Sequence, residues 1–253
     1  MQRYFIHLAY KGTAYHGWQI QENTPNTVQQ VLNEKLSMVF NEPITVTGCG
    51  RTDTGVHAKD FYAHFDSTKE ELHLHEGKWL HKLNSVLPPD IAIYNIHAVH
   101  AEANSRFDAI ARTYEYYISK EKNPFLTDSA HFSHINYNID AMNNAAKLLL
   151  KYSDFSCFSK SNTQTFTNNC KITEAYWKED NGLLIFTISA DRFLRNMVRA
   201  IVGTLLEIGE GKLNDQDLIK IIESKDRSNA GVSVPACGLY LKKITYPTEL
   251  LNE

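Results

Sequence analysis

The chain has 253 residues, a formal net charge of −3, 43% hydrophobic and 22% charged residues, a composition that is typical of a soluble globular protein and excludes a disordered or low-complexity chain. No stretch approaches the roughly 20 apolar residues that a membrane helix needs, and the first residues lack a signal-peptide core, so we expect a cytoplasmic protein. The four cysteines form no CxxC pair, which predicts neither a disulfide framework nor a zinc knuckle.

The first hundred residues alternate between strand-like and helix-like patterns. Thr27 is a candidate helix N-cap, with Gln30 three residues later, and apolar residues at helical spacing follow it as far as residue 40. The other predicted elements are strands at 3–10, 44–49, 61–65 and 91–99 and a helix at 74–87. The resulting β-α-β-β-α-β order is that of a ferredoxin-like unit.

The second half of the chain repeats much of this order. Its predicted elements are a strand at 112–120, a helix at 140–151, a hairpin of strands 172–178 and 183–190, helices at 193–208 and 215–224, and a strand at 239–246. We therefore expect an α/β fold of the α+β type, built from two ferredoxin-like halves, residues 1–106 and 107–253. No Pro- or Gly-rich linker marks the boundary, so the halves are expected to share an interface.

The stretch GCGRTDTGVHA, residues 48–58, fits neither a helix nor an amphipathic strand. It lies between two predicted strands and therefore belongs at the edge of a sheet, where its glycines allow close backbone approach. By local pattern alone Asp53, Thr54 and Gly55 are more typical of a simple turn than of a catalytic site.

Basic residues recur at helical spacing near the second half's main helix. Arg192, Arg195 and Arg199 are three and four residues apart, which predicts a basic stripe on one helix face. Such a stripe could bind the phosphates of a nucleic acid, although a solvated surface is the simpler interpretation.

The segment GRTDTGVHA, residues 50–58, resembles the signature of the TruA-type tRNA pseudouridine synthases. Further segments that are similar to this family follow in the family's order: YKGTAYHGWQ (10–19), LPPDIAI (87–93), ARTYEYYI (111–118), FLRNMVRAIVG (193–203) and PACGLYL (235–241). One departure is Thr54, where the family usually has Ala.

The resemblance implies two ferredoxin-like halves joined in one continuous antiparallel sheet, with helices on one side and a central RNA-binding cleft. It implies a homodimer that converts uridine to pseudouridine at positions 38, 39 and 40 in the tRNA anticodon stem-loop. That reaction is an isomerisation, so no cofactor and no metal are expected.

The resemblance also implies roles for three residues. Asp53 corresponds to the family's nucleophile, and Arg199 to an arginine that would keep a carboxylate in a cleft ionised. Tyr114 would stack on the target uracil and assist proton transfer from C5. Tyr114 and Tyr116 point to the same strand face, so one of them is expected to serve packing only.

We expect further basic and aromatic side chains to hold the substrate, because unstacking a base costs a few kcal/mol that phosphate contacts must offset. Besides Tyr114, the candidates are Arg51, His57, Lys59, Arg106, Phe107, Arg112, Arg192 and Arg195. For His16 and Trp18, structural roles and RNA contacts remain alternatives.

Other classes of function fit the sequence less well. The histidine pairs lack a third ligand at a familiar zinc spacing, and nucleotide-binding fingerprints are missing. A hydrolase using Asp53 would need a second carboxylate, for which Asp60 and Asp66 are the nearest candidates. A non-catalytic RNA-binding protein would need exposed aromatics on a sheet face instead.

Overall fold

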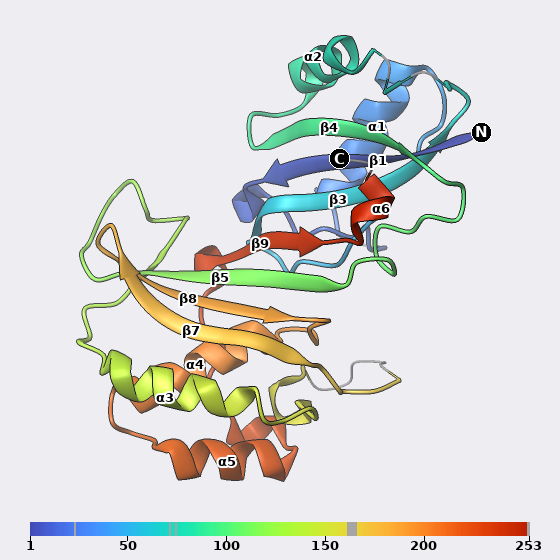
Figure 1. The fold of residues 1–253 in the computed structure, drawn as a ribbon. Coiled ribbons are helices and arrows are strands. Elements are labelled where there is room, and N and C mark those ends of the chain that lie inside the picture. Colours follow the sequence, from blue (N-terminus) through green and yellow to red (C-terminus); the bar gives the residue numbers. More distant parts are fainter. Residues whose placement is uncertain (23, 71, 74, 161–165, 252–253) are drawn as a thin grey trace. The chain divides into compact units, whose positions relative to one another are not determined.

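A computed structural model describes residues 1–22, 24–70, 72–73, 75–160 and 166–251 (Figure 1). It divides into a first unit, residues 1–110 together with the chain from 241 onward, and a second unit, residues 111–240. Within the described residues the elements include nine strands and six α-helices, which confirms the mixed α/β class. A sheet that is continuous through both halves, with a cleft between them, stays a prediction.

The first unit has the predicted β-α-β-β-α-β order. Its elements are β1 (Gln2–Tyr10), α1 (Val28–Phe40), β2 (Thr47–Gly48), β3 (His57–Ser67), α2 (Glu76–Val86) and β4 (Ile91–Val99). β1 lies between β3 and β4 and is antiparallel to both. The last strand, β9 (Leu239–Thr245), lies beside β3, and the short α6 (Thr248–Leu251) follows it.

Local sequence signals explain where the helices of the first unit begin. The Thr27 side chain accepts a hydrogen bond from the backbone N–H of Gln30 at 3.3 Å, as the N-cap prediction requires. α2 begins at Glu76, and Leu74, where we expected its start, lies outside the described residues. Trp79 of α2 is half-buried and meets Phe40 of α1 edge-on, with 5.3 Å between ring centroids.

The strand predicted at 44–49 is wrong for most of its length, because only Thr47 and Gly48 pair with β3. The backbone N–H of Ile44 donates to Ser37 Oγ at 2.8 Å, and that of Val46 donates to Asn33 Oδ1 at 2.9 Å. Side chains of α1 therefore satisfy backbone groups that a neighbouring strand would otherwise bind. The apolar alternation reflects burial against α1.

The second unit contains an antiparallel sheet in which β8 lies between β5 and β7. Its main elements are β5 (Ala111–Ser119), α3 (Ile139–Leu149), β7 (Ile172–Asp180), β8 (Leu183–Ala190), α4 (Met197–Gly209) and α5 (Asp215–Ser224). The β7–β8 hairpin turns at Asn181 and Gly182, which have φ of 49° and 78°, as a type I′ turn requires. α3 packs on β7 and against α4 and α5 (Figure 1).

The helix predicted from residue 193 begins four residues later, at Met197. Its N-cap, Asn196, is left-handed with φ of 66°, so the chain cannot continue helically into the residues before it. Of the three arginines that we expected on one helix face, only Arg199 lies on α4, while Arg192 and Arg195 precede it. The predicted basic stripe is therefore wrong as a helical feature.

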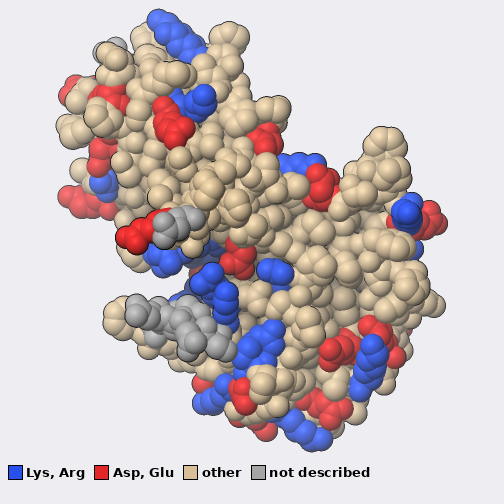
Figure 2. Space-filling view, turned by 180° about the vertical axis from the view of Figure 1, so that it is seen from behind, with Lys and Arg blue, Asp and Glu red and all other residues tan. Residues whose placement is uncertain are grey.

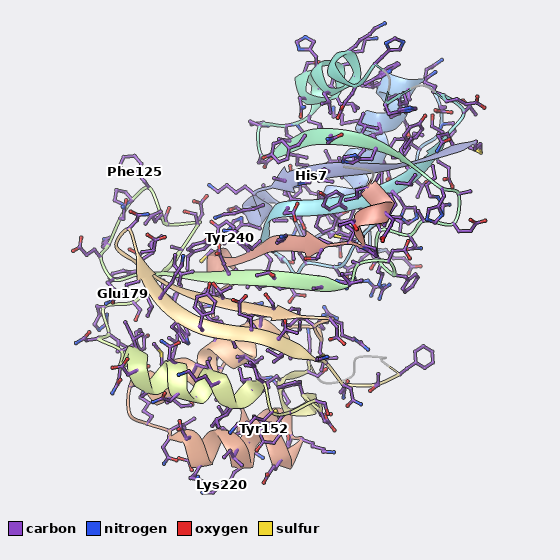
Figure 3. All side chains as sticks on the ribbon, in the orientation of Figure 1. His7, Phe125, Tyr152, Glu179, Lys220 and Tyr240 are labelled. Carbon is purple, nitrogen blue, oxygen red and sulfur yellow. The ribbon has the colours of Figure 1, made fainter. Side chains whose placement is uncertain are left out.

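The connection between β5 and β6 (His131–Phe132) packs against strands β5 and β8, with which it forms a small core. Tyr117, Ala130 and Ile185 make this core, whereas Phe125 points away from the sheet and is 89% exposed (Figure 3).

Among the described residues, no helix combines the length and apolarity required to cross a membrane. The same part of the chain holds no group of three or more His, Cys, Asp or Glu side chains suited to a metal ion.

Candidate functional site

The loop that carries Asp53 packs directly on the segment that follows β1, backbone against backbone. A Cβ on Gly12 would lie 2.0 Å from the carbonyl oxygen of Val56, and one on Gly17 would lie 2.5 Å from that of Thr52. Gly17 also has a φ of +86°. Both glycines belong to the segment YKGTAYHGWQ, which the sequence analysis linked to the family. Only the fold shows that their close contacts are with the backbone of the Asp53 loop.

Side chains of the first unit fix this loop at both ends. The Tyr10 hydroxyl lies 2.8 Å from Thr52 Oγ1 in a buried hydrogen bond. The His57 side chain accepts a hydrogen bond from the Gly12 N–H, at 2.9 Å from Nδ1, and the residue is only 1% exposed. This burial favours a positioning role for His57 over the RNA contact that we expected. Sequence reasoning missed Tyr10 as a supporting residue.

Trp18 is structural, whereas His16 lies at the surface. The Trp18 residue is 2% exposed, and its ring centroid is 4.1 Å from that of Phe61. A Cβ on Gly48 would lie 2.4 Å from the Trp18 ring, so the indole fills the space beside the start of the loop. His16 is exposed, and its Nδ1 is 2.7 Å from the carbonyl oxygen of Pro25.

Asp53 occupies the first position of a tight turn. The backbone N–H of Val56 donates to the Asp53 carbonyl at 3.1 Å, and Gly55 has the φ of +79° that a type II turn needs at its third position. Asp53 is half-buried, whereas Thr54 is exposed. The extra hydroxyl and methyl that distinguish Thr54 from the family's usual Ala therefore have room in solvent.

The two carboxylates that a hydrolase could use as a second acid are engaged elsewhere on β3. Asp60 Oδ1 lies 2.7 Å from His7 Nε2, and Asp60 Oδ2 accepts a hydrogen bond from the Ile244 N–H at 2.7 Å. Asp66 pairs with Arg3 at 2.8 Å, and the Arg3 guanidinium lowers the pKa of that carboxyl. These contacts favour structural roles for both acids.

Of the two tyrosines compared on β5, Tyr116 is the packing residue. It is fully buried, its hydroxyl donates to the Pro235 carbonyl at 2.9 Å, and burial raises its pKa. Tyr114 is half-buried and lies opposite Ile188 on β8. Its ring meets that of Phe193 edge-on, with 5.1 Å between centroids. Tyr114 is therefore the more accessible of the two phenols.

Arg199 lies in the first turn of α4 and is held by a neighbouring segment of the second unit. Its Nε donates to the Val234 carbonyl at 2.7 Å, and its own carbonyl accepts from the Val234 N–H at 3.3 Å. A Cβ on Gly203 would lie 1.9 Å from the Val232 carbonyl oxygen, so this segment lies directly on the helix. The guanidinium is thus oriented by the backbone. Its predicted approach to Asp53, a residue of the first unit, stays a prediction.

The remaining predicted binding residues are basic or aromatic and mostly accessible. Several Lys and Arg side chains lie close together in the lower half of the view in Figure 2. The Arg106 guanidinium lies 5.4 Å from the ring centroid of Phe107, which is 76% exposed. Exposed positions are Arg51, Lys59, Arg106, Phe107 and Arg195, and half-buried ones are Arg112 and Arg192.

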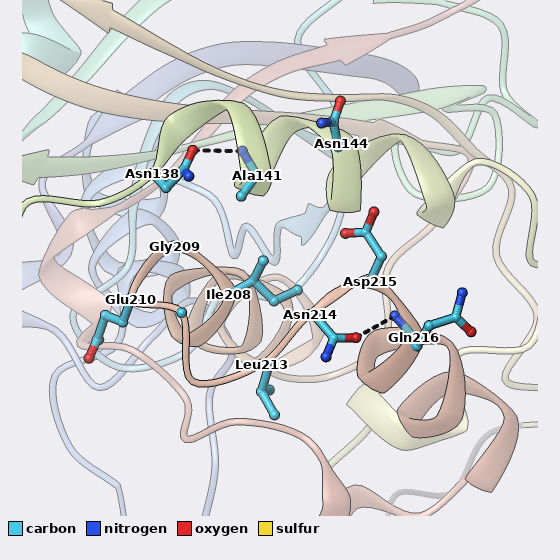
Figure 4. Close-up of a pocket in the computed structure, with 11 residues that line it drawn as sticks. Asn138, Ala141, Asn144, Ile208, Gly209, Glu210, Leu213, Asn214, Asp215 and Gln216 are labelled. Carbon is cyan, nitrogen blue, oxygen red and sulfur yellow. Dashed lines mark hydrogen bonds between the residues drawn. The ribbon is translucent and has the colours of Figure 1, made fainter.

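A pocket of about 690 Å³ opens in the second unit among α3, α4 and α5 (Figure 4). Its lining includes the helix-capping residues Asn138 and Asn214 and the end of α4 at Gly209. None of its eleven lining residues is among the predicted site residues, so this pocket is a separate feature of helix packing.

Comparison with known proteins places the whole chain in one group. The sequence profile described as tRNA pseudouridine synthase matches residues 7–108 and 145–247. The tRNA pseudouridine synthase A of Bacteroides fragilis is 50% identical over 253 residues, which cover 100% of this chain and 99% of the relative. That of Porphyromonas gingivalis is 49% identical over 256 residues, with 99% of each chain covered. With the Asp53 loop inside the matched ranges, these similarities lead to one conclusion: the chain belongs to the tRNA pseudouridine synthase family.

Proposed function

We propose that this protein isomerises uridine to pseudouridine at positions 38, 39 and 40 of the tRNA anticodon stem-loop, with Asp53 as the nucleophile. The observation that carries the proposal is the loop itself. A single half-buried carboxylate sits on a turn that glycine contacts and two buried side-chain hydrogen bonds hold in place. Relatives that match the full chain carry the name tRNA pseudouridine synthase A.

The reaction breaks the N-glycosidic bond, turns the uracil and rejoins it through C5, so it needs one well-placed anion and a way to move a proton. Asp53 supplies the anion, by attack on the sugar, by attack on the base or by proton abstraction beside the anomeric carbon. Arg199 favours the ionised form of the carboxylate. Tyr114 stacks on the uracil and helps to transfer the C5 proton.

Substrate binding uses cations around these three residues, because phosphate contacts must offset the cost of extruding the base. Arg51 and Lys59 flank Asp53, and Arg106 with Phe107 adds a second accessible pair in the first unit. Further cations come from the second unit: Arg112, Arg192 and Arg195. His57 positions the loop through its contact with Gly12.

The same proposal includes a homodimer acting in the cytoplasm without a cofactor or metal. A second subunit would let RNA bound by one chain reach the active site of the other. Isomerisation conserves atoms and electrons, so the chemistry itself calls for no co-substrate.

The test is an unmodified tRNA transcript carrying tritium at uracil C5, incubated with purified protein and no additives. We expect tritium release and pseudouridine at positions 38–40. Asp53→Asn should abolish release while RNA affinity stays within about twofold, because the amide keeps the size of the side chain and loses only its charge. Asp60→Asn, which changes a carboxylate engaged with His7 on β3, is the matched control and should retain release.

Four results would contradict the proposal. Tritium release by the Asp53→Asn variant would show that Asp53 is not the nucleophile. Free uracil among the products would indicate a hydrolase, and unchanged RNA with tight binding by the parent protein would indicate a binding module. Modification confined to another stem of the tRNA would refute the substrate assignment.

A further inference from the structure

One end of the second unit's sheet brings together cations that are far apart in the sequence. Ala190, the last residue of β8, pairs with Arg112 on β5 and with Ile172 on β7. Arg112, Lys171 and Arg192 therefore lie at the same end of three adjacent strands. Sequence analysis selected Arg112 and Arg192, but Lys171 is isolated from every motif and was missed.

A single acidic residue, Asp191, contacts all three of these positions. Asp191 Oδ1 accepts hydrogen bonds from the backbone N–H of Lys171 at 2.8 Å and of Arg192 at 2.7 Å. The Asp191 carbonyl accepts from the Arg112 guanidinium at 2.8 Å, and its N–H donates to the Lys171 carbonyl at 3.2 Å. The bend after β8 is thus held mainly by hydrogen bonds that centre on one residue.

A second backbone contact extends the group. The Lys160 N–H donates to the Arg195 carbonyl at 3.1 Å, which brings another pair of exposed cations beside the turn that leads into α4. We name the set the cation cluster. Its members are Arg112, Lys160, Lys171, Arg192 and Arg195.

A carboxylate inside a cation cluster is unfavourable for binding an anion, because its charge repels phosphate. Its presence at this position therefore needs another reason, and its geometry supplies one. Asp191 Oδ1 serves as an acceptor for two backbone N–H groups, a role that requires an acceptor oxygen at this position. An Asn side chain offers the same acceptor without the charge.

We infer that Asp191 is a positioning residue for tRNA binding, which holds the backbone so that the cation cluster presents one phosphate-binding surface, and that Lys160 and Lys171 are additional phosphate contacts. The inference rests on the proposed function, because it takes the phosphate backbone of a tRNA as the ligand. Since each phosphate contact releases counterions, the salt dependence of affinity counts such contacts.

The experiment measures the Kd of the full-length protein for an unmodified tRNA transcript between about 50 and about 300 mM salt, a range over which phosphate contacts change affinity strongly. Asp191→Ala should raise Kd about 10-fold and reduce the slope of log Kd against log salt by about 1 to 2. In tritium release, KM should rise while kcat at saturating tRNA stays within about twofold. Asp191→Asn should bind as the parent does or more tightly.

The direction of the change in Kd distinguishes a positioning role of Asp191 from a purely electrostatic effect of its charge. Loss of a negative charge alone would tighten RNA binding, so weaker binding by Asp191→Ala together with recovery by Asp191→Asn requires the lost acceptor. Asn214→Ala is the matched control, because Asn214 Oδ1 also accepts two backbone N–H groups, those of Gln216 and Asp217, at the start of α5. This control should leave Kd and the salt slope unchanged.

The inference is overturned if Asp191→Ala keeps the parent's Kd and slope, or if Asp191→Asn is as weak as Asp191→Ala. Should Asp191→Ala fail to fold, Lys171→Ala keeps the backbone N–H and should still lower the slope by about 1; an unchanged slope would overturn the inference. Failure of the proposed function can be distinguished from failure of this inference. If the protein shows this binding pattern but releases no tritium, the isomerase proposal is refuted and the inference about the cation cluster still holds.

Discussion

Gly17→Ala tests whether close backbone packing holds Asp53 in place. A Cβ at this position would lie 2.5 Å from the Thr52 carbonyl oxygen and 3.3 Å from the Asp53 carbonyl carbon. Cβ contacts below 3.0 Å essentially do not occur, and ordinary contacts begin at 3.4 Å. The loop must therefore move by 0.5 to 0.9 Å, the difference between 2.5 Å and that range. The same movement lengthens the hydrogen bond from the Trp18 N–H to the Thr52 carbonyl, now 3.2 Å.

Two effects on stability add in this variant. The left-handed φ of +86° costs alanine about 1–2 kcal/mol, of which about 0.4–1 kcal/mol is offset by the stiffer unfolded chain. The displaced loop loses about 1 kcal/mol more with its hydrogen bond. We expect the free energy of unfolding to fall by about 2 kcal/mol, and kcat to fall about 10- to 100-fold, because a misplacement near 1 Å costs on the order of 10²-fold.

Gly182→Ala separates backbone strain from displacement of the loop. Gly182 has a similar φ of +78° in the β7–β8 turn, but nothing lies within 4 Å of its Cβ position. This variant should lose about 1 kcal/mol of stability and keep its kcat. Tritium release at saturating tRNA and thermal unfolding measure both quantities. If Gly17→Ala keeps the parent's kcat, or if both variants lose kcat equally, close packing does not position Asp53.

Two further variants probe the first unit. Tyr10→Phe removes the buried hydrogen bond to Thr52 Oγ1 and should cost about 1–2 kcal/mol of unfolding free energy, with a smaller loss of kcat than Gly17→Ala. Denaturant titration measures the stability and tritium release measures kcat. If the variant keeps the parent's stability and kcat, this hydrogen bond does not anchor the loop. Burial, with a smaller contribution from Arg3, lowers the pKa of His64, and the Ser105 N–H donates to His64 Nδ1, so folding favours the neutral ring. Stability from this site is therefore full above pH about 6.5 and declines as the pH falls through that value toward the folded pKa. His64→Gln should flatten the fall in melting temperature between about pH 7.5 and about pH 5.5, and an equally steep fall in the variant would refute this assignment.

Most elements were predictable because their signals are local. The N-cap at Thr27, the strand at 91–99, the hairpin of strands 172–178 and 183–190 and the helix at 215–224 each depend on residues that are adjacent in the chain. The structure places all of them as expected. Such signals act through propensity, capping and turn geometry, which neighbours in sequence decide.

The failed predictions have non-local causes. The strand at 44–49 is replaced by contacts with side chains of α1, and the start of α4 is set by a left-handed Asn196 whose side chain donates to Ser233. In both places the apolar pattern correctly marks burial. The partner of the backbone, which determines the element, comes from elsewhere in the chain.

The sequence by itself determined the order of most elements, through periodicity and turn signals, and its motifs carry the resemblance that implied the family and the residues proposed for chemistry. Only the tertiary structure decided that Tyr116 is the buried tyrosine, that His57 supports a loop, and that Asp191 joins three strand ends. The reason is physical: a side chain's exposure and hydrogen-bond partners depend on which distant segments pack against it, and no local pattern encodes those partners.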